Sequence, residues 1–175
     1  AQTVKVATAY RTENSPKIDG RADDPEWQQA PVINEFRQYR PLFDKPGGQQ
    51  TEVRILYDNY ALYVLAVMHD THPDSILRQL GSRDDEDLNT DWFGIKLDTY
   101  DNQTDGYSFV VTAAGVQRDF SVADESYNAV WSSAARISDE GWCAELKIPY
   151  SAIRFPKIET QQWGLQLLRY VRRNR

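Results

Sequence analysis

Apolar and polar residues alternate along most of this chain, in short runs separated by turn-forming residues. The clearest example is Glu52–Asp70, where two apolar runs flank the tetrapeptide DNYA. Two such runs around a short polar break are typical of a β-hairpin with a tight turn. The segment therefore predicts two antiparallel strands.

Residues 92–98, WFGIKLD, have the period of two that gives a strand two different faces. One face holds Phe93, Ile95 and Leu97, and the other holds Trp92, Gly94 and Lys96. We expect the first face to lie in the core and the second to form a candidate surface.

Further strand patterns follow at 107–113, 116–122, 129–137, 141–149 and 163–171. In the last of these, Leu165 and Leu167 face opposite to Gln166 and Leu168. Strand signals that return every 8 to 12 residues or so are typical of an all-β sandwich. The only helical signals are short turns near 74–80 and 150–156. The chain 1–175 is thus predicted to be a single β-sandwich domain of two antiparallel sheets, with one or two short helical turns.

The same alternation predicts which side chains fill the space between the sheets. The expected core includes Val53, Ile55, Val64, Phe93, Ile95, Leu97, Phe109, Leu146, Ile148, Leu165 and Leu167.

Residues Lys17–Pro31, KIDGRADDPEWQQAP, contain too many helix and strand breakers for a regular element. Ile18 and Trp27 are the two isolated large apolar residues of this segment. We expect a loop that these two side chains hold against the rest of the domain.

Charge and composition exclude two classes of partner. The net charge of −6 offers no broad basic face for a phosphate backbone, so nucleic acid is not expected to bind. No apolar run approaches the roughly 20 residues that a membrane-spanning helix needs. The 5 Trp, 10 Tyr and 6 Phe residues favour β structure or a recognition surface.

Four blocks resemble carbohydrate-binding module family 9 and the wider group of DOMON-like β-sandwiches. They are IDGRADDPEW, VRILYDNYALYVLAVMHD, DWFGIKLDT and GWCAELKIPYSAI, in that order. The resemblance implies a jelly-roll or DOMON-like fold in which Trp27 is wedged against the sandwich. It also implies that Ile18 begins an edge strand and that Gly20 permits a turn.

Two longer phrases, RDDEDLNTDWFGIKLDTYDNQTDGYSFVVTAAGVQRD and WGLQLLRYVRRNR, resemble a narrower subgroup. In that subgroup the module precedes an outer-membrane β-barrel in bacterial envelope proteins. The resemblance implies an exported protein, periplasmic or associated with the outer membrane or cell surface. It also implies that this chain is the N-terminal part of a longer protein, with its own downstream β-barrel as a partner.

The family holds a sugar ring between tryptophans and binds its hydroxyl groups through Glu, Arg and Gln side chains. The corresponding positions here are Leu88 for the clamp tryptophan, Gly94 for the acid, Val110 for the arginine and Leu168 for the glutamine. None of these residues has the required chemistry. We therefore expect no measurable binding of glucose, cellobiose or xylobiose through that site.

Other residues of the expected concave face could bind a glycan in a different way. Six candidates combine stacking surface with hydrogen-bonding groups: Trp92, Lys96, Arg118, Trp131, Gln166 and Tyr170. For two of them a structural role is the main alternative, with Trp131 in the core and Trp92 covering a sheet edge.

The acidic run 84–87 and Asp91 could gather oxygen ligands for a structural calcium ion, with Asp85, Asp87 and Asp91 as ligands. The alternative is a solvated acidic loop. His69 and His72 give a weaker zinc pattern, because His69 and Asp70 would point apart on a strand. We expect no other cofactor.

No pair of carboxylates and no Gly-x-Ser-x-Gly motif marks a catalytic site. Together with this absence, the family resemblance implies a non-catalytic module that recognises carbohydrate on the cell envelope. Two alternatives stay open: an interaction or plug domain that binds its own C-terminal β-barrel or a protein partner, and an accessory module of a glycoside hydrolase.

Overall fold

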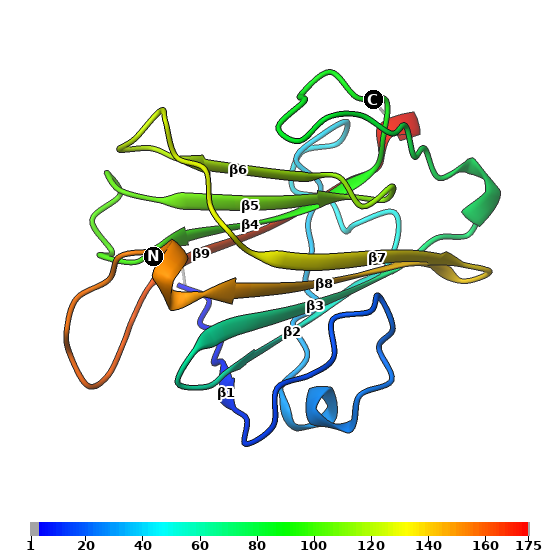
Figure 1. The fold of residues 1–175 in the computed structure, drawn as a ribbon. Coiled ribbons are helices and arrows are strands. Elements are labelled where there is room, and N and C mark those ends of the chain that lie inside the picture. The colour runs from blue at the N-terminus through cyan, green and yellow to red at the C-terminus, as the bar shows by residue number, and fades with distance from the viewer. Residues whose placement is uncertain (1–3, 175) are drawn as a thin grey trace.

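A computed structural model describes residues 4–174, which form two β-sheets packed face to face (Figure 1). The five-stranded sheet has the order β1 (Tyr10–Arg11), β2 (Thr51–Tyr57), β3 (Ala61–His69), β8 (Gly141–Pro149) and β7 (Ser132–Ser138). The four-stranded sheet has the order β6 (Gln117–Ser121), β5 (Tyr107–Thr112), β4 (Trp92–Asp98) and β9 (Gly164–Tyr170). All neighbouring strands are antiparallel except β1 and β2. The predicted all-β sandwich is confirmed.

In the part of the chain that the structure describes, the helical elements are four 3₁₀ turns: η1 (Pro25–Gln29), η2 (Pro73–Ser75), η3 (Tyr150–Ala152) and η4 (Arg172–Asn174). The turn expected near 74–80 is shorter than predicted, because the backbone is already extended at Ile76. No helix within residues 4–174 has both the length and the apolarity to cross a membrane.

The core lies between the two sheets, where the alternation predicted it. Nine of the expected core residues are buried there: Val53, Ile55, Val64, Phe93, Ile95, Leu97, Phe109, Leu146 and Ile148. Leu165 and Leu167 are half-buried and pack against the same cluster from β9, at the edge of its sheet. The sandwich therefore buries one face of each sheet.

The other face of the five-stranded sheet is covered by the segment that precedes β2. Figure 1 shows η1 beneath this sheet, on the side away from the four-stranded one. Trp27 is fully buried in a second apolar cluster with Leu56, Tyr63 and Leu65. Trp27 is thus the anchor that the sequence predicted.

Glu145, a residue of β8, fixes this segment to the sheet. Its Oε1 accepts hydrogen bonds from the backbone N–H groups of Asp19 (3.0 Å) and Gly20 (2.8 Å), and its Oε2 accepts one from Trp27 Nε1 (3.0 Å). Burial raises the pKa of Glu145 to about 7, although these three donors favour its charged form. A single buried carboxylate therefore ties the segment to β8.

Two expectations for this segment have different outcomes. Gly20 has a φ of +80°, so the predicted glycine turn is confirmed. The prediction that Ile18 begins an edge strand is wrong: Ile18 packs against the Trp27 cluster outside any strand, and the edge strand is β1, earlier in the chain. The apolar contact, rather than strand pairing, fixes Ile18.

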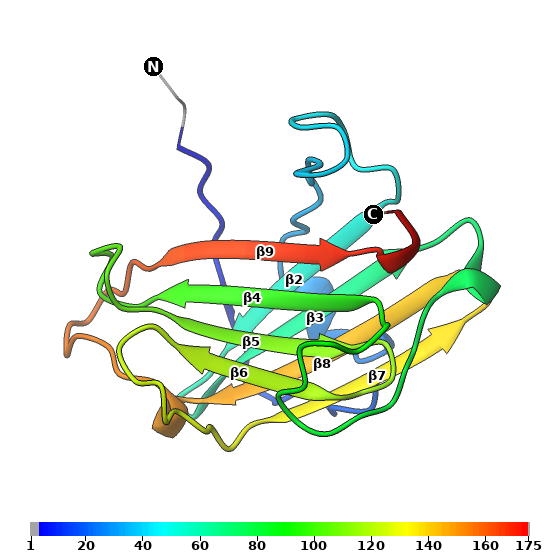
Figure 2. The ribbon, with the colours of Figure 1, turned by 90° about the horizontal axis from the view of Figure 1, so that it is seen from above.

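Within residues 4–174, no strand or helix covers the outer face of the four-stranded sheet. In Figure 2 the ribbons of β9, β4, β5 and β6 lie in front, with no other strand or helix over them. This face is the one that the sequence marked as a candidate surface.

Candidate functional site

The outer face consists of the side chains that alternate with the core residues of the four-stranded sheet. They come from four strands: Trp92, Gly94 and Lys96 of β4, Ser108 and Val110 of β5, Arg118 and Phe120 of β6, and Gln166, Leu168 and Tyr170 of β9. Of the six predicted binding residues, the structure brings five onto this face and leaves out Trp131.

A ladder of stacked groups crosses the outer face. Trp92 and Tyr170 are directly paired across β4 and β9, and their ring centroids lie 5.4 Å apart with planes 25° from parallel. The Arg118 guanidinium lies over the Trp92 ring, 5.6 Å from its centroid, and the Arg172 guanidinium lies over Tyr170 at 6.0 Å. Strand order places Arg118 and Tyr170 on opposite sides of Trp92.

Several hydrogen bonds hold the far end of this ladder. The Arg172 side chain donates from Nε to Asn89 Oδ1 (3.0 Å), and its backbone N–H donates to Asp91 Oδ1 (3.1 Å). Asp91 is fully buried, and burial raises the pKa of its carboxyl. Asp91 therefore serves to anchor the chain just beyond β9.

Gly94 makes room for the indole of Trp92. A Cβ at this position would lie 3.1 Å from Val110 Cγ2 and 3.3 Å from Trp92 Cζ3. Both distances are too short for comfortable contact, so a larger residue would displace the indole. The glycine thus lets Trp92 lean along β4.

Polar groups flank the ladder one row further along the sheet. Lys96 is paired with Ser108 on one side and Gln166 on the other, and Lys96 and Gln166 are exposed. Phe120 lies opposite Ser108 and is 55% exposed. The outer face therefore offers aromatic surface, amide and hydroxyl groups, and cations.

Trp131 belongs to the core, as the alternative interpretation of the sequence held. It is 6% exposed, packs edge to face on Phe109 with centroids 5.3 Å apart, and donates from Nε1 to Asp119 Oδ2 (3.0 Å). The same carboxylate is paired with Arg83. Trp131 fills this position because the inward face of β6 is polar and gives the indole N–H an acceptor.

Three of the four residues that the sequence comparison aligned with sugar-binding positions of the family are neighbours in the structure, and none of the four carries a polar side chain. Gly94 is paired with Val110 on β5 and with Leu168 on β9, so the three form one apolar row across the outer face. Leu88 is buried. Polar binding groups are found only beside this row.

The predicted calcium ligands are not gathered around one point. Asp91 is buried and bonded to the Arg172 backbone, whereas Asp85 Oδ1 accepts a hydrogen bond from the Asp87 backbone (2.9 Å). A different group of three carboxylates does come together within residues 4–174. The side-chain oxygens of Asp19, Asp23 and Asp24 lie within 4.8 Å of one another. Exposed acidic groups often gather without a metal, so this geometry alone does not define a calcium site.

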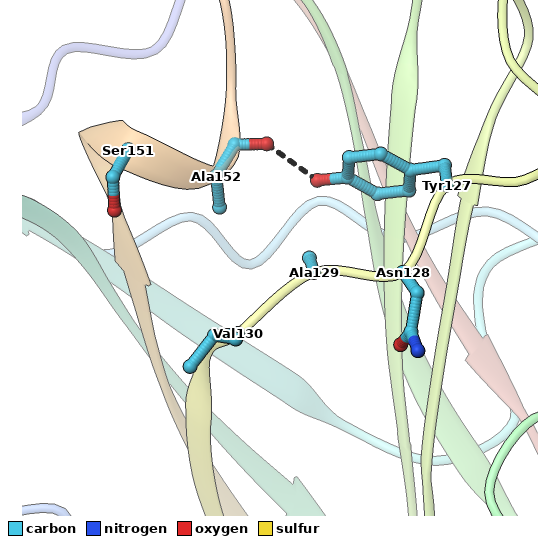
Figure 3. A pocket seen from close by; sticks show the side chains of 6 residues that line it. All are labelled: Tyr127, Asn128, Ala129, Val130, Ser151 and Ala152. Carbon is cyan, nitrogen blue, oxygen red and sulfur yellow. Dashed lines mark hydrogen bonds between the residues drawn. The ribbon is translucent and has the colours of Figure 1, made fainter.

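Two hollows lie away from the outer face. One, of about 270 Å³, is formed by residues 127–130 and by Ser151 and Ala152, with Tyr127 Oη donating to the Ala152 carbonyl (2.6 Å; Figure 3). The other, of about 370 Å³, lies at the turn between β5 and β6. The first has no charged group in its lining, so it offers little to orient a polar ligand.

Sequence reasoning missed two members of the outer face, Phe120 and Arg172. Phe120 alternates in step with Arg118, so the period of two could have identified it. Arg172 lies beyond the last strand, in η4, and no local pattern indicates that its side chain folds back over Tyr170.

Comparison with known proteins agrees with this architecture. A family model described as "Carbohydrate family 9 binding domain-like" matches residues 18–173. A family 9 carbohydrate-binding module from Caldicellulosiruptor kristjanssonii in complex with glucose superposes with a TM-score of 0.62 at 20% identity, covering 93% of this chain and 76% of that chain. A family 9 module from the same organism in complex with cellotriose gives 0.60 at 18% identity, covering 91% and 74%.

No curated protein matches the chain at a significant level. The likeness to the two solved modules supports the fold, and the family match extends over most of the chain. The chain therefore belongs to the carbohydrate family 9 binding domain-like family.

Proposed function

We propose that this domain is a non-catalytic carbohydrate-binding module that holds a glycan against the outer face. The observation that carries the proposal is the stacked pair of Trp92 and Tyr170 on an uncovered sheet face. Family membership supports it, and so do the related modules whose solved complexes contain glucose and cellotriose.

The chemistry of the outer face suits a glycan chain better than a single sugar ring. The exposed ring of Phe120 and the ring edges of Trp92 and Tyr170 can contact the C–H patches of sugars, while Lys96 and Gln166 can bind hydroxyl groups. However, the strand order puts Arg118 and Tyr170 against the two sides of Trp92, so no sugar can be clamped there as the family does. Binding must therefore come from several weak contacts along the face.

The arrangement of carboxylates supports binding without hydrolysis. Glycosidases need two carboxyl groups that flank the scissile bond. Within residues 4–174, the outward positions of β6, β5, β4 and β9 include one carboxylate, that of Asp98 at the end of β4. It accepts hydrogen bonds from the backbone of Asn102 (3.4 Å) and Gln103 (2.7 Å) instead.

The cellular setting is part of the same proposal. An exported module on the periplasmic or outer surface of a bacterial cell would meet glycans there. As the N-terminal part of a longer protein, it would present them to a downstream β-barrel of the same polypeptide.

Affinity electrophoresis against a panel of neutral and acidic polysaccharides tests the proposal. We expect at least one polysaccharide to retard the wild-type domain, and Trp92→Ala to abolish most of that retardation. Tyr60→Ala is the matched control, because Tyr60 is 77% exposed in the turn between β2 and β3 of the other sheet. Retardation by no member of the panel, or equal loss in both variants, would contradict the proposal.

One feature favours an interaction domain as a second candidate. The loop 37–45 exposes Tyr39 (75%), Leu42 (59%) and Phe43 (75%) on a short, self-paired turn. Exposed apolar groups of this kind often contact a protein partner. Replacing these three residues with serine should weaken capture of the downstream polypeptide and leave glycan retardation unchanged, if the loop has this role.

A further inference from the structure

The outer face is locally positive in a protein whose net charge is −6. Lys96 and Arg118 lie on it, and Arg172 borders it beyond Tyr170. One carboxylate, Asp98, shares this face with the three cations, and its oxygens are turned to the loop after β4, where they accept backbone hydrogen bonds from Asn102 and Gln103. The aromatic ladder is therefore set among cations.

These three cations have no anionic partner in the part of the chain that the structure describes. Within residues 4–174, none of the ion pairs includes Lys96, Arg118 or Arg172. By contrast, Arg83 and Arg173 each bind a carboxylate. The charges of the outer face are thus free to meet an external anion.

Arg118 is also positioned for such an anion. Its guanidinium uses one flat side to stack on Trp92, which leaves the N–H groups at its edge. Its Nε is buried and has no hydrogen-bond partner. The buried Nε is closed to an external ligand, so the terminal Nη groups are the donors that an anion would meet.

Lys96 and Arg118 have a spacing that suits a glycan. Arg118 is opposite Val110, Val110 is opposite Gly94, and Lys96 lies in the next row. From ordinary strand spacing, the Cα atoms of the two cations are about 12 Å apart. Their long side chains can reach one carboxylate or those of neighbouring sugar units.

We infer that the outer face selects glycans bearing negative charges, above all the carboxylates of uronic acids, over their neutral counterparts. The inference rests on the proposed function of the same face. Arginine favours carboxylates because its fork of donors matches their two oxygens.

The net negative charge of the protein does not prevent this selection. At physiological ionic strength, charges more than about 8 Å away are largely screened, so the cations at the face decide. The acidic run 84–87 lies at the β6 edge, where the Asp84 N–H donates to the Gln117 carbonyl (3.1 Å).

Calorimetry with a matched pair of ligands tests the inference. The probes are tetragalacturonate and its methyl ester, which has the same backbone without charge, in calcium-free buffer so that no metal bridges the acid to acidic side chains. A sulfated, carboxylate-free carrageenan tetrasaccharide separates sulfate from carboxylate as the source of charge. Lys96→Gln and Arg118→Gln are compared with Lys157→Gln, which removes an exposed lysine from the loop before β9.

We expect the acid to bind about tenfold or more tightly than its ester, with affinity falling as salt rises. Lys96→Gln and Arg118→Gln should each weaken binding of the acid about fivefold to tenfold, and Lys157→Gln less than twofold.

Binding of the carrageenan fragment alone would still support anion selection and would assign it to sulfate. Equal binding of acid and ester would overturn the inference but leave the proposed function intact. Failure of every glycan, neutral ones included, would overturn both, and acid binding that all three variants retain would place the site elsewhere.

Discussion

At the scale of single residues, Glu145 makes the clearest prediction about stability. Its pKa is raised from 4.5 in the unfolded chain to about 7 in the fold, mainly by burial. The folded state therefore holds this proton more tightly, and stability falls as pH rises from about 4.5 to 7. We expect the free energy of unfolding to drop by about 3 kcal/mol across this window from this group alone.

Urea denaturation at pH 5, 6, 7 and 8 measures this decline, with Glu145→Gln as the comparison. The amide does not titrate, so the decline should be smaller in the variant. The same slope in both proteins would show that Glu145 stays charged throughout.

Trp92 and Trp131 should respond differently to truncation. Trp131→Ala opens a cavity beside Phe109 and leaves Asp119 without its indole donor, so it should cost about 3 to 5 kcal/mol of unfolding free energy. Trp92→Ala removes only a surface stack and should cost about 2 kcal/mol or less. The urea midpoints of the two variants measure these losses of unfolding free energy. A larger loss in Trp92→Ala than in Trp131→Ala would mean that Trp92 is the core residue and Trp131 the surface one.

At the scale of elements, the turn between β7 and β8 depends on Gly141. Its φ is +141°, and a Cβ there would lie 2.0 Å from the Met68 carbonyl oxygen. Gly141→Ala should therefore cost about 3 kcal/mol or more, since the backbone of β3 would have to move. Gly115 is the matched control: its φ is +86°, but nothing lies within 4 Å of an added Cβ.

Gly115→Ala should cost only about 1 kcal/mol, the price of a positive φ without a clash. Equilibrium unfolding of the two alanine variants checks the difference. Equal losses would indicate that backbone conformation alone, and not the contact with β3, makes Gly141 necessary.

The strands could be predicted from the sequence because their two faces differ. The period of two at Phe93, Ile95 and Leu97 reflects burial of one face only, and the structure places all three in the core. Ile18 could not be placed, because an isolated apolar residue among turn-forming residues has no period. Its position depends on the distant cluster around Trp27.

At the scale of the whole molecule, the site could be predicted only in part. Trp92, Lys96, Gln166 and Tyr170 follow from strand alternation, and strand pairing then brings them together. The burial of Trp131 depends on Asp119, which lies on an inward face of β6 that is polar and so has no hydrophobic signal. The folding back of Arg172 depends on Asn89, 83 residues earlier in the chain.

The most direct test of glycan binding at the outer face is an NMR titration that follows the indole N–H resonances of the five tryptophans. Trp131 and Trp142 are buried between the sheets and Trp27 in the second cluster, and the Trp163 indole donates to Gln161 in the loop before β9. With the polysaccharide fragment that binds best as ligand, we expect a progressive, saturable shift of the Trp92 resonance, while the other four resonances move by only a small fraction of that change. Saturation of the domain with no movement of Trp92, or a shift centred on Trp163, would contradict glycan binding at the outer face.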